Sequence, residues 1–131
     1  MNRYLFDSSA IITLVESSKL DELLEGWTID LAFYELGNAV WKQVHLYRTL
    51  SMDEAKIALD ALVSVFDKMR KVQELEPLST LVIAVTEGLS YYDAAYLQAA
   101  VDKKMILVTD DKTLRQVGGK YVNTVTSREA I

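Results

Sequence analysis

The chain has 131 residues, of which 50% are hydrophobic and 25% are charged, as in an ordinary globular protein. It contains no cysteine, which excludes disulfide bonds and thiolate metal sites and suits a reducing cytoplasm. The N-terminus lacks the apolar stretch of a signal peptide, and no segment reaches the roughly 20 apolar residues of a membrane span. We therefore expect one cytoplasmic domain over residues 1–131, without membrane association.

The formal net charge of −5 at pH 7 argues against a broadly basic surface that would attract nucleic acid. This argument is not decisive, because several carboxylates can share one pocket. A divalent cation bound there would cancel part of the field that a phosphate group meets.

The first half of the chain predicts two strands and two helices. Residues 3–6, RYLF, predict a short buried strand, and DSSAIITLVE predicts a turn and a helix that Ser8 or Ser9 caps. Residues 28–32, TIDLA, predict the second strand. A helix is expected from Phe33 to Arg48, with Glu35 in its first turn. The apolar residues expected to face inward from these helices are Ile11, Ile12, Leu14, Val15, Leu36, Val40, Val44 and Tyr47.

The second half continues the alternation. The sequence SMDE is a capping box that opens a helix from Met52 to Arg70. The later elements are expected to be a strand in KVQEL (71–75), a helix over 79–87 that ends at Gly88, a helix over 92–102, and strands in MILVT (105–109) and YVNTV (121–125). Short strands separated by helices predict an α/β protein, a three-layer α/β/α sandwich with a mainly parallel central sheet.

Acidic residues follow two of the predicted strands. Asp7 comes after the first strand, and Asp110 and Asp111 come after MILVT, at the strand ends where parallel sheets bind ligands. Glu35 and Asp93 lie in the first turns of predicted helices, where the helix dipole stabilises an ionised carboxylate. Each acid alone is more often a capping or turn residue, so only the set indicates a site.

Four motifs hold these acids, in the order FDSSA, FYELGNA, YYDAAYL and LVTDDKTL. With them the sequence resembles, over essentially its whole length, the PIN domain, and most closely the toxin ribonucleases of VapBC toxin–antitoxin pairs. The resemblance implies a metal-dependent endoribonuclease that cleaves RNA, a VapB-like antitoxin partner and a homodimer. It assigns metal binding and catalysis to Asp7, Glu35, Asp93 and Asp111.

The same resemblance assigns supporting roles to Ser9, Asn38 and Thr109. Asp111 is preferred to Asp110 as the fourth acid because the family's local pattern is Thr, any residue, Asp. Asp110 is therefore expected to support the site.

The chemistry of the acids agrees with this reading. Converging carboxylates repel one another and raise each other's pKa values unless a hard divalent cation bridges them. Oxygen ligands favour Mg²⁺ or Mn²⁺, whereas the single His45 and the absence of cysteine leave no nitrogen and sulfur cluster for zinc. Such a cation binds a phosphate oxygen, lowers the pKa of a bound water and stabilises charge during attack on phosphorus.

Four other functions are alternatives for a chain with acids at these positions. A phosphoacceptor receiver domain would place its acidic pair after the first strand, whereas the pair here comes late. A haloacid-dehalogenase-type phosphatase needs an Asp two residues after Asp7, and that residue is Ser9. A PIN-type RNA-processing nuclease and a catalytically silent PIN-like interaction module remain open.

The other polar and aromatic residues carry weaker signals. His45 is expected to be structural or solvated. Tyr91, Tyr92 and Tyr96 can stack on bases, but at helical spacing they are more often packing residues. The basic residues near the motifs, read as surface charges, are Lys42, Arg48, Lys112 and Arg115.

A homodimer is expected for a second reason, because the helix over 52–70 carries apolar residues on more than one face. These residues are Ala55, Ala58, Leu59, Leu62, Val63, Phe66 and Met69.

Overall fold

The computed structural model describes residues 3–131, so the first two residues of the expected domain lie outside it. In chain order its elements are β1 (Tyr4–Phe6), α1 (Ser8–Glu16), α2 (Asp21–Leu24), β2 (Trp27–Thr28), α3 (Leu31–His45), α4 (Met52–Lys68), β3 (Arg70–Lys71), α5 (Pro77–Glu87), α6 (Tyr91–Lys103), β4 (Ile106–Val108), α7 (Lys112–Gly118), β5 (Thr124–Val125) and α8 (Ser127–Ala130). The strands form one sheet in the order β3-β2-β1-β4-β5, and all its pairings are parallel.

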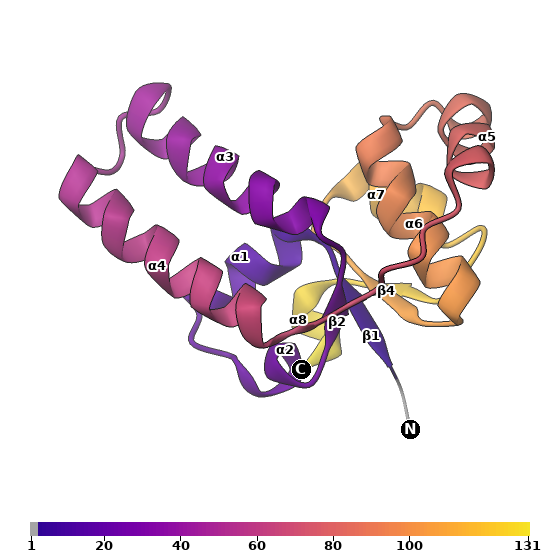
Figure 1. Cartoon of the computed structure of the whole chain (residues 1–131), viewed down its shortest axis with the longest axis horizontal. Helices are drawn as coiled ribbons and strands as arrows, with labels where there is room; N and C mark the ends of the chain where they lie inside the picture. Colours follow the sequence, from indigo (N-terminus) through magenta and orange to yellow (C-terminus); the bar gives the residue numbers. More distant parts are fainter. Residues whose placement is uncertain (1–2) are drawn as a thin grey trace.

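Helices cover both faces of this sheet, which confirms the predicted α/β/α sandwich. On one face α1 packs against α3, α4 and α8, and on the other α6 packs against β1, β4, α5 and α7. Figure 1 shows α3 and α4 as a long antiparallel pair on one side of the molecule, with α5, α6 and α7 on the other. None of the helices between residues 3 and 131 combines the length and apolar content needed to cross a bilayer.

The core is centred on the two middle strands, β1 and β4. Leu5, Phe6, Leu107 and Val108 are fully buried between the helical layers. The strands pair with Leu5 opposite Leu107 and Phe6 opposite Val108, so their carboxyl ends are level. The residues that follow these ends, Asp7 and Thr109, therefore lie side by side.

The second strand was predicted too late in the chain. It is β2, Trp27–Thr28, and Asp30 already stands at the N-cap of α3, without a side-chain capping bond that could signal a helix start. Glu35 consequently lies outside the first turn of α3, so the prediction that the helix dipole stabilises it is wrong.

The cap of the first helix was also assigned wrongly. Asp7 is the N-cap of α1, and its carboxylate accepts a hydrogen bond from the Ala10 backbone N–H. Ser9 instead donates its hydroxyl to Asp7. The sequence did not predict α2, α7 and α8, because helices of four to seven residues are too short to show a clear hydrophobic period.

Most other boundaries agree within two residues. The capping box of Ser51 and Glu54 opens α4, as predicted. Helix α5 ends at Gly88, whose φ of 71° is a left-handed conformation that suits glycine. The strand predicted in residues 71–75 is only Arg70–Lys71. Tyr47, expected to face inward, lies beyond α3 and is 60% exposed.

Helix α4 does not present most of its apolar residues to solvent. Ala55, Leu62, Phe66 and Met69 are buried, so four of the seven residues proposed for a subunit interface belong to the core of the chain itself. The clearest exposed apolar face is on α5, where Leu78, Leu81, Val82 and Val85 are each at least half exposed.

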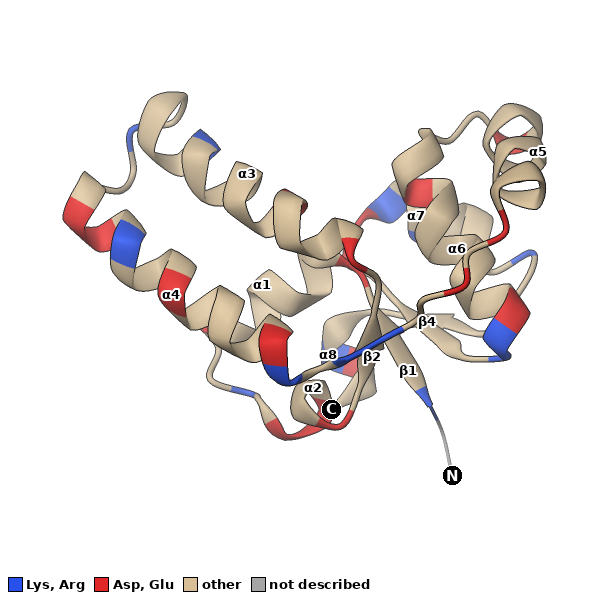
Figure 2. Ribbon diagram, viewed as in Figure 1, with Lys and Arg blue, Asp and Glu red and all other residues tan. Residues whose placement is uncertain are grey.

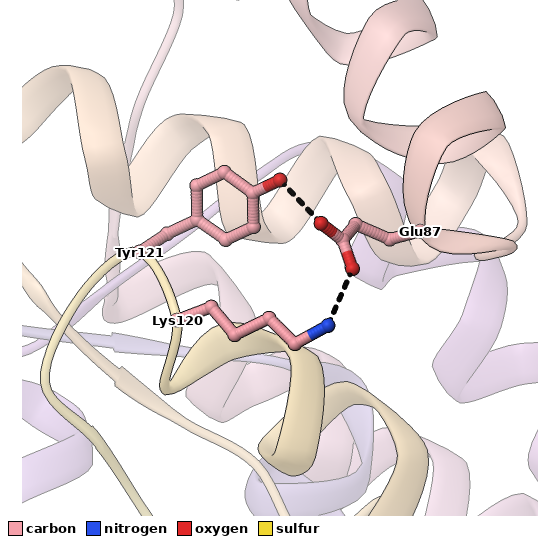
Figure 3. A network of polar contacts seen from close by, with 3 residues as sticks. All are labelled: Glu87, Lys120 and Tyr121. Atoms are coloured by element: carbon pink, nitrogen blue, oxygen red, sulfur yellow. Dashed lines mark hydrogen bonds and ion pairs between the residues drawn. The ribbon is translucent and has the colours of Figure 1, made fainter.

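A polar network joins the end of α5 to the loop before β5 (Figure 3). Glu87 accepts hydrogen bonds from Lys120 Nζ at 2.9 Å and from the Tyr121 hydroxyl at 2.6 Å. Lys120 is largely exposed to solvent, so this ion pair contributes little to stability and mainly fixes the position of the loop.

Candidate active site

Asp7 is held at the end of β1 by three hydrogen bonds and is only 5% exposed. Its Oδ1 accepts from Ser9 Oγ at 2.7 Å and from Ala10 N at 2.9 Å, and its Oδ2 accepts from Thr109 Oγ1. A carboxylate oxygen has two lone pairs, so Oδ2 keeps one of them for another ligand. The neighbouring polar groups thus fix the direction in which Asp7 can bind.

Thr109 and Ser9 connect the ends of β1 and β4. Thr109 is fully buried, and its Oγ1 accepts from the Asp111 backbone N–H at 3.0 Å while donating to Asp7. Ser9 Oγ accepts from the Asp110 N–H at 3.0 Å and donates to Asp7. Each hydroxyl therefore contacts one acid by its proton and the backbone of another by its oxygen, in the place where the sequence predicted supporting residues.

Glu35 approaches the same region from α3. Its Oε1 accepts hydrogen bonds from the Ser8 hydroxyl at 3.1 Å and the Tyr96 hydroxyl at 2.7 Å. Tyr96 is 1% exposed, and burial followed by the nearby Glu35 raises the pKa of its phenol, so the hydroxyl stays protonated and donates.

Sequence reasoning missed both Ser8 and Tyr96 as partners of Glu35. Tyr96 was read as a packing residue, although its place three residues after Asp93 on a helix puts the two on one face.

Asp93 lies in the first turn of α6, as predicted, and its backbone N–H donates to Ser90 Oγ at 3.0 Å. Burial raises the pKa of Asp93, and the charges of Asp111 and Glu35 raise it further. Burial also raises the pKa of Asp7 from 3.8 to about 6, because it outweighs the hydrogen bonds from Thr109, Ala10 and Ser9 that lower this pKa, and the charge of Asp93 adds a small further increase. Asp93 therefore interacts electrostatically with each of the other three predicted acids.

The two adjacent acids after β4 have different surroundings. Asp110 uses both carboxylate oxygens on Ser127, accepting from its backbone N–H at 2.9 Å and from its hydroxyl at 2.7 Å. Asp111 caps α7 with Oδ1, which accepts from Leu114 N at 2.8 Å. The charge of Asp111 raises the pKa of Asp93, so Asp111 lies close enough to act on that acid.

The donor set has the chemistry of a site for a hard cation. Asp7 Oδ2 keeps a lone pair, and Oε2 of Glu35, Oδ2 of Asp111 and both oxygens of Asp93 accept no hydrogen bond from residues 3–131. Carboxylate oxygens are the ligands that Mg²⁺ and Mn²⁺ prefer. Within that range no three acidic or histidine side chains lie close enough together to hold a metal ion, so the four acids do not form a closed cluster in this structure.

A pocket of about 450 Å³ opens beside Glu35. Its lining residues are Leu31, Tyr34, Glu35, Asn38 and Tyr92. Asn38 thus lines the same pocket as Glu35. His45 does not line it and stacks on Trp41, with ring centroids 5.0 Å apart, which agrees with a structural or solvated role.

The comparisons with known proteins point to one family, although no family model matches the chain. It is 34% identical over 116 residues to Exonuclease VapC9 of Pyrobaculum aerophilum, with 85% of this chain and 82% of the relative covered. It is 32% identical over 134 residues to Ribonuclease VapC3 of the same organism, with 95% and 98% covered.

Solved structures with the same fold include PAE2754 from Pyrobaculum aerophilum, which has a TM-score of 0.81 and 26% identity, with 98% of this chain and 93% of that chain covered. FitAcB from Neisseria gonorrhoeae has a TM-score of 0.62 over 95% and 98% of the chains, and at 14% identity it shows likeness of fold alone. The fold and the identity to two VapC proteins over most of the chain show that this protein belongs to the VapC-type PIN-domain family.

Proposed function

We propose that residues 1–131 form one PIN-like nuclease domain, a Mg²⁺- or Mn²⁺-dependent endoribonuclease that hydrolyses phosphodiester bonds in RNA. The observation that carries the proposal is a group of four acids, Asp7 and Asp111 after β1 and β4 and Glu35 and Asp93 on α3 and α6, in which Asp93 interacts with each of the others and every acid has an oxygen left for a ligand. Two relatives named as an exonuclease and a ribonuclease support a nuclease activity.

Asp7, Glu35, Asp93 and Asp111 would hold the metal ion. When bound, the cation would supply a charge that polarises a phosphate and acidifies an attacking water. The chain's own residues fix the ligands: Ser9 and Thr109 orient Asp7, while Tyr96 orients Glu35. Because burial and mutual repulsion penalise the ionised carboxylates, a divalent cation would remove a cost already present in the fold.

Chelation is expected to abolish the activity. The purified protein should cut single-stranded RNA with Mg²⁺ or Mn²⁺, lose cleavage in excess EDTA and recover it when the metal is restored. Single-stranded RNA is the expected substrate because its unpaired bases and flexible phosphates enter a confined pocket more easily than a duplex does. Full activity in EDTA would rule out the metal mechanism.

A circular single-stranded RNA separates the two modes of cleavage. An endonuclease linearises the circle, whereas an exonuclease needs an end. Since one relative is named an exonuclease, a linear RNA that is degraded while the circle stays intact would replace the endonuclease assignment.

A toxin role in the cytoplasm requires a partner that restrains cleavage, and we propose a VapB-like antitoxin. An arginine or lysine of the antitoxin would pair with the acids. An amphipathic segment would lie in the apolar groove of about 300 Å³ between α1, α3 and α4, whose lining includes Ile12, Val15, Val40 and Leu62. The groove begins one helical turn along α3 from Glu35, at Ala39.

The expected result is co-purification with a small protein encoded directly upstream that blocks cleavage. Replacing the antitoxin arginine or lysine that pairs with the acids should restore cleavage more than replacing a charged residue at the rim of the interface. Cells that tolerate the active enzyme without such a partner would contradict the toxin role and leave the nuclease assignment intact.

A homodimer is proposed as the functional unit. The exposed apolar face of α5 is the proposed contact surface between the two subunits, because Leu78, Val82 and Val85 are 72%, 62% and 75% exposed. Light scattering should give twice the mass of one chain at micromolar concentration, and Val85→Lys should shift the population toward monomers. A monomer mass throughout that range would contradict the dimer.

A further inference from the structure

The pocket beside Glu35 has two tyrosines at its mouth. Tyr34 of α3 is 71% exposed and Tyr92 of α6 is 60% exposed, and both line the pocket. Each directly precedes an acid of the site in the sequence, Tyr34 before Glu35 and Tyr92 before Asp93. Two aromatic rings from different helices are thus presented to solvent next to the carboxylates.

These two tyrosines differ from the neighbouring Tyr91 and Tyr96, whose hydroxyl groups make hydrogen bonds within the protein. Tyr96 is buried and bonded to Glu35, and the Tyr91 hydroxyl donates to the Pro77 carbonyl at 3.4 Å, which ties α6 to α5. The core thus accounts for Tyr96, and a hydrogen bond engages Tyr91, which is 44% exposed, whereas Tyr34 and Tyr92 expose most of their surface to solvent. The structure therefore separates Tyr92 from Tyr91 and Tyr96, which the sequence treated alike.

The ring of Tyr34 packs against a neighbouring aromatic ring. Phe33 meets it edge to face, with centroids 5.2 Å apart and planes at 85°, and Phe33 also contacts the buried Phe66 at 5.8 Å. A ring that is already ordered loses less conformational entropy when a ligand stacks on it.

Charge alone does not explain how this chain would hold RNA. The net charge is −5, and Lys and Arg positions are scattered over the elements in the view of Figure 2 rather than gathered beside α3 and α6. Among residues 3–131, the only charged residue that lines the pocket is Glu35. Stacking of a base on an aromatic ring does not depend on a basic surface, and the other lining groups offer an apolar wall, Leu31, and an amide, Asn38.

We propose that Tyr34 and Tyr92 form a nucleobase site in which an unstacked base of single-stranded RNA lies against the rings, next to the phosphodiester bond that is hydrolysed. Asn38 can donate to and accept from the polar edge of that base. The inference rests on the proposed function, because it names how the same site holds its RNA. It makes both tyrosines determinants of substrate binding rather than of the chemical step.

The first test measures base stacking without cleavage. A short single-stranded oligoribonucleotide that contains 2-aminopurine is titrated, with Mg²⁺ present, into the Asp93→Asn protein, and the quenching of its fluorescence reports stacking. Adding Tyr34→Leu or Tyr92→Leu should weaken binding about tenfold and reduce the quenching, because each change removes a stacking ring. Tyr34→Phe and Tyr92→Phe should retain both.

The matched control is Tyr47→Leu, since Tyr47 is also 60% exposed but does not line the pocket, and this change should have no effect. Equal quenching and affinity in all variants would overturn the nucleobase site. So would a loss in Tyr47→Leu as large as in the other two.

The second test uses the active protein. Tyr34→Leu and Tyr92→Leu should each raise KM for single-stranded RNA about tenfold and leave kcat within about twofold, as expected when ground-state binding is lost. Unchanged KM in both variants of an enzyme that cuts RNA would overturn the nucleobase site and leave the nuclease assignment standing. If the fluorescence quenching depends on Tyr34 and Tyr92 but the unaltered protein cuts no RNA, the nucleobase site would stand and the nuclease assignment would be overturned.

Discussion

Asp7→Asn and Asp93→Asn are each expected to lower RNA cleavage by about two orders of magnitude or more while the fold persists. Each change removes one negative ligand and nearly preserves the volume of the side chain. Cleavage of a single-stranded RNA in Mg²⁺, measured at saturating protein, tests this directly. Asp60→Asn, an exposed acid on α4, is the matched control and should cut RNA like the unaltered protein.

The Asp7→Asn protein is expected to stay folded because the ionised carboxylate of Asp7 destabilises the metal-free protein. Burial raises its pKa to about 6, so above that pH the ionised carboxylate destabilises the folded chain. As pH falls through 6 toward the ordinary value of 3.8, protonation removes this cost and the metal-free protein should become relatively more stable.

Asp7→Asn lacks that charge, so in EDTA at pH 8 it should melt at the same temperature as the unaltered protein or higher. Its melting temperature should also rise less than that of the unaltered protein as the pH is lowered from 8 through 6. Near-normal turnover in either Asn variant would remove that residue from the site, and a melting temperature far below that of the unaltered protein would contradict the account of Asp7.

The second large effect distinguishes the two acids after β4. Asp111→Asn should lower cleavage by about the same two orders of magnitude, because the acid that faces Asp93 loses its charge. Its stability should change little, since Asn caps α7 as well as Asp does. Asp110→Asn should keep most of the activity and lose about 1 kcal/mol of stability, because its charge strengthens the hydrogen bonds to Ser127.

RNA cleavage assays and urea unfolding of both variants test whether Asp111→Asn loses activity and Asp110→Asn loses stability. Ser127→Ala is a useful third variant, because it removes the hydroxyl partner of Asp110 without changing any acid. It should resemble Asp110→Asn in stability and in activity. A larger loss of cleavage in Asp110→Asn than in Asp111→Asn would assign the fourth acid to Asp110.

Local patterns in the sequence were enough for the architecture and for the order of the acids. Short apolar strands between helices predicted the parallel sheet, and acids after the first strand and after MILVT predicted a site at the strand ends. The capping box at Ser51 and the glycine at 88 located a helix start and a helix end. These features depend on hydrophobic period and on backbone groups a few residues away, so they can be read from neighbouring residues.

Tertiary structure decided how each acid is surrounded. The bond of Tyr96 to Glu35 joins residues 61 apart, and that of Thr109 to Asp7 joins residues 102 apart. The different partners of Asp110 and Asp111 and the exposure of Tyr34 and Tyr92 likewise depend on which helices meet across the sheet. The sequence by itself determined which elements form and which carboxylates follow them. Burial, pKa and free lone pairs came only from packing, because a side chain's environment is set by residues that the chain brings together from far apart.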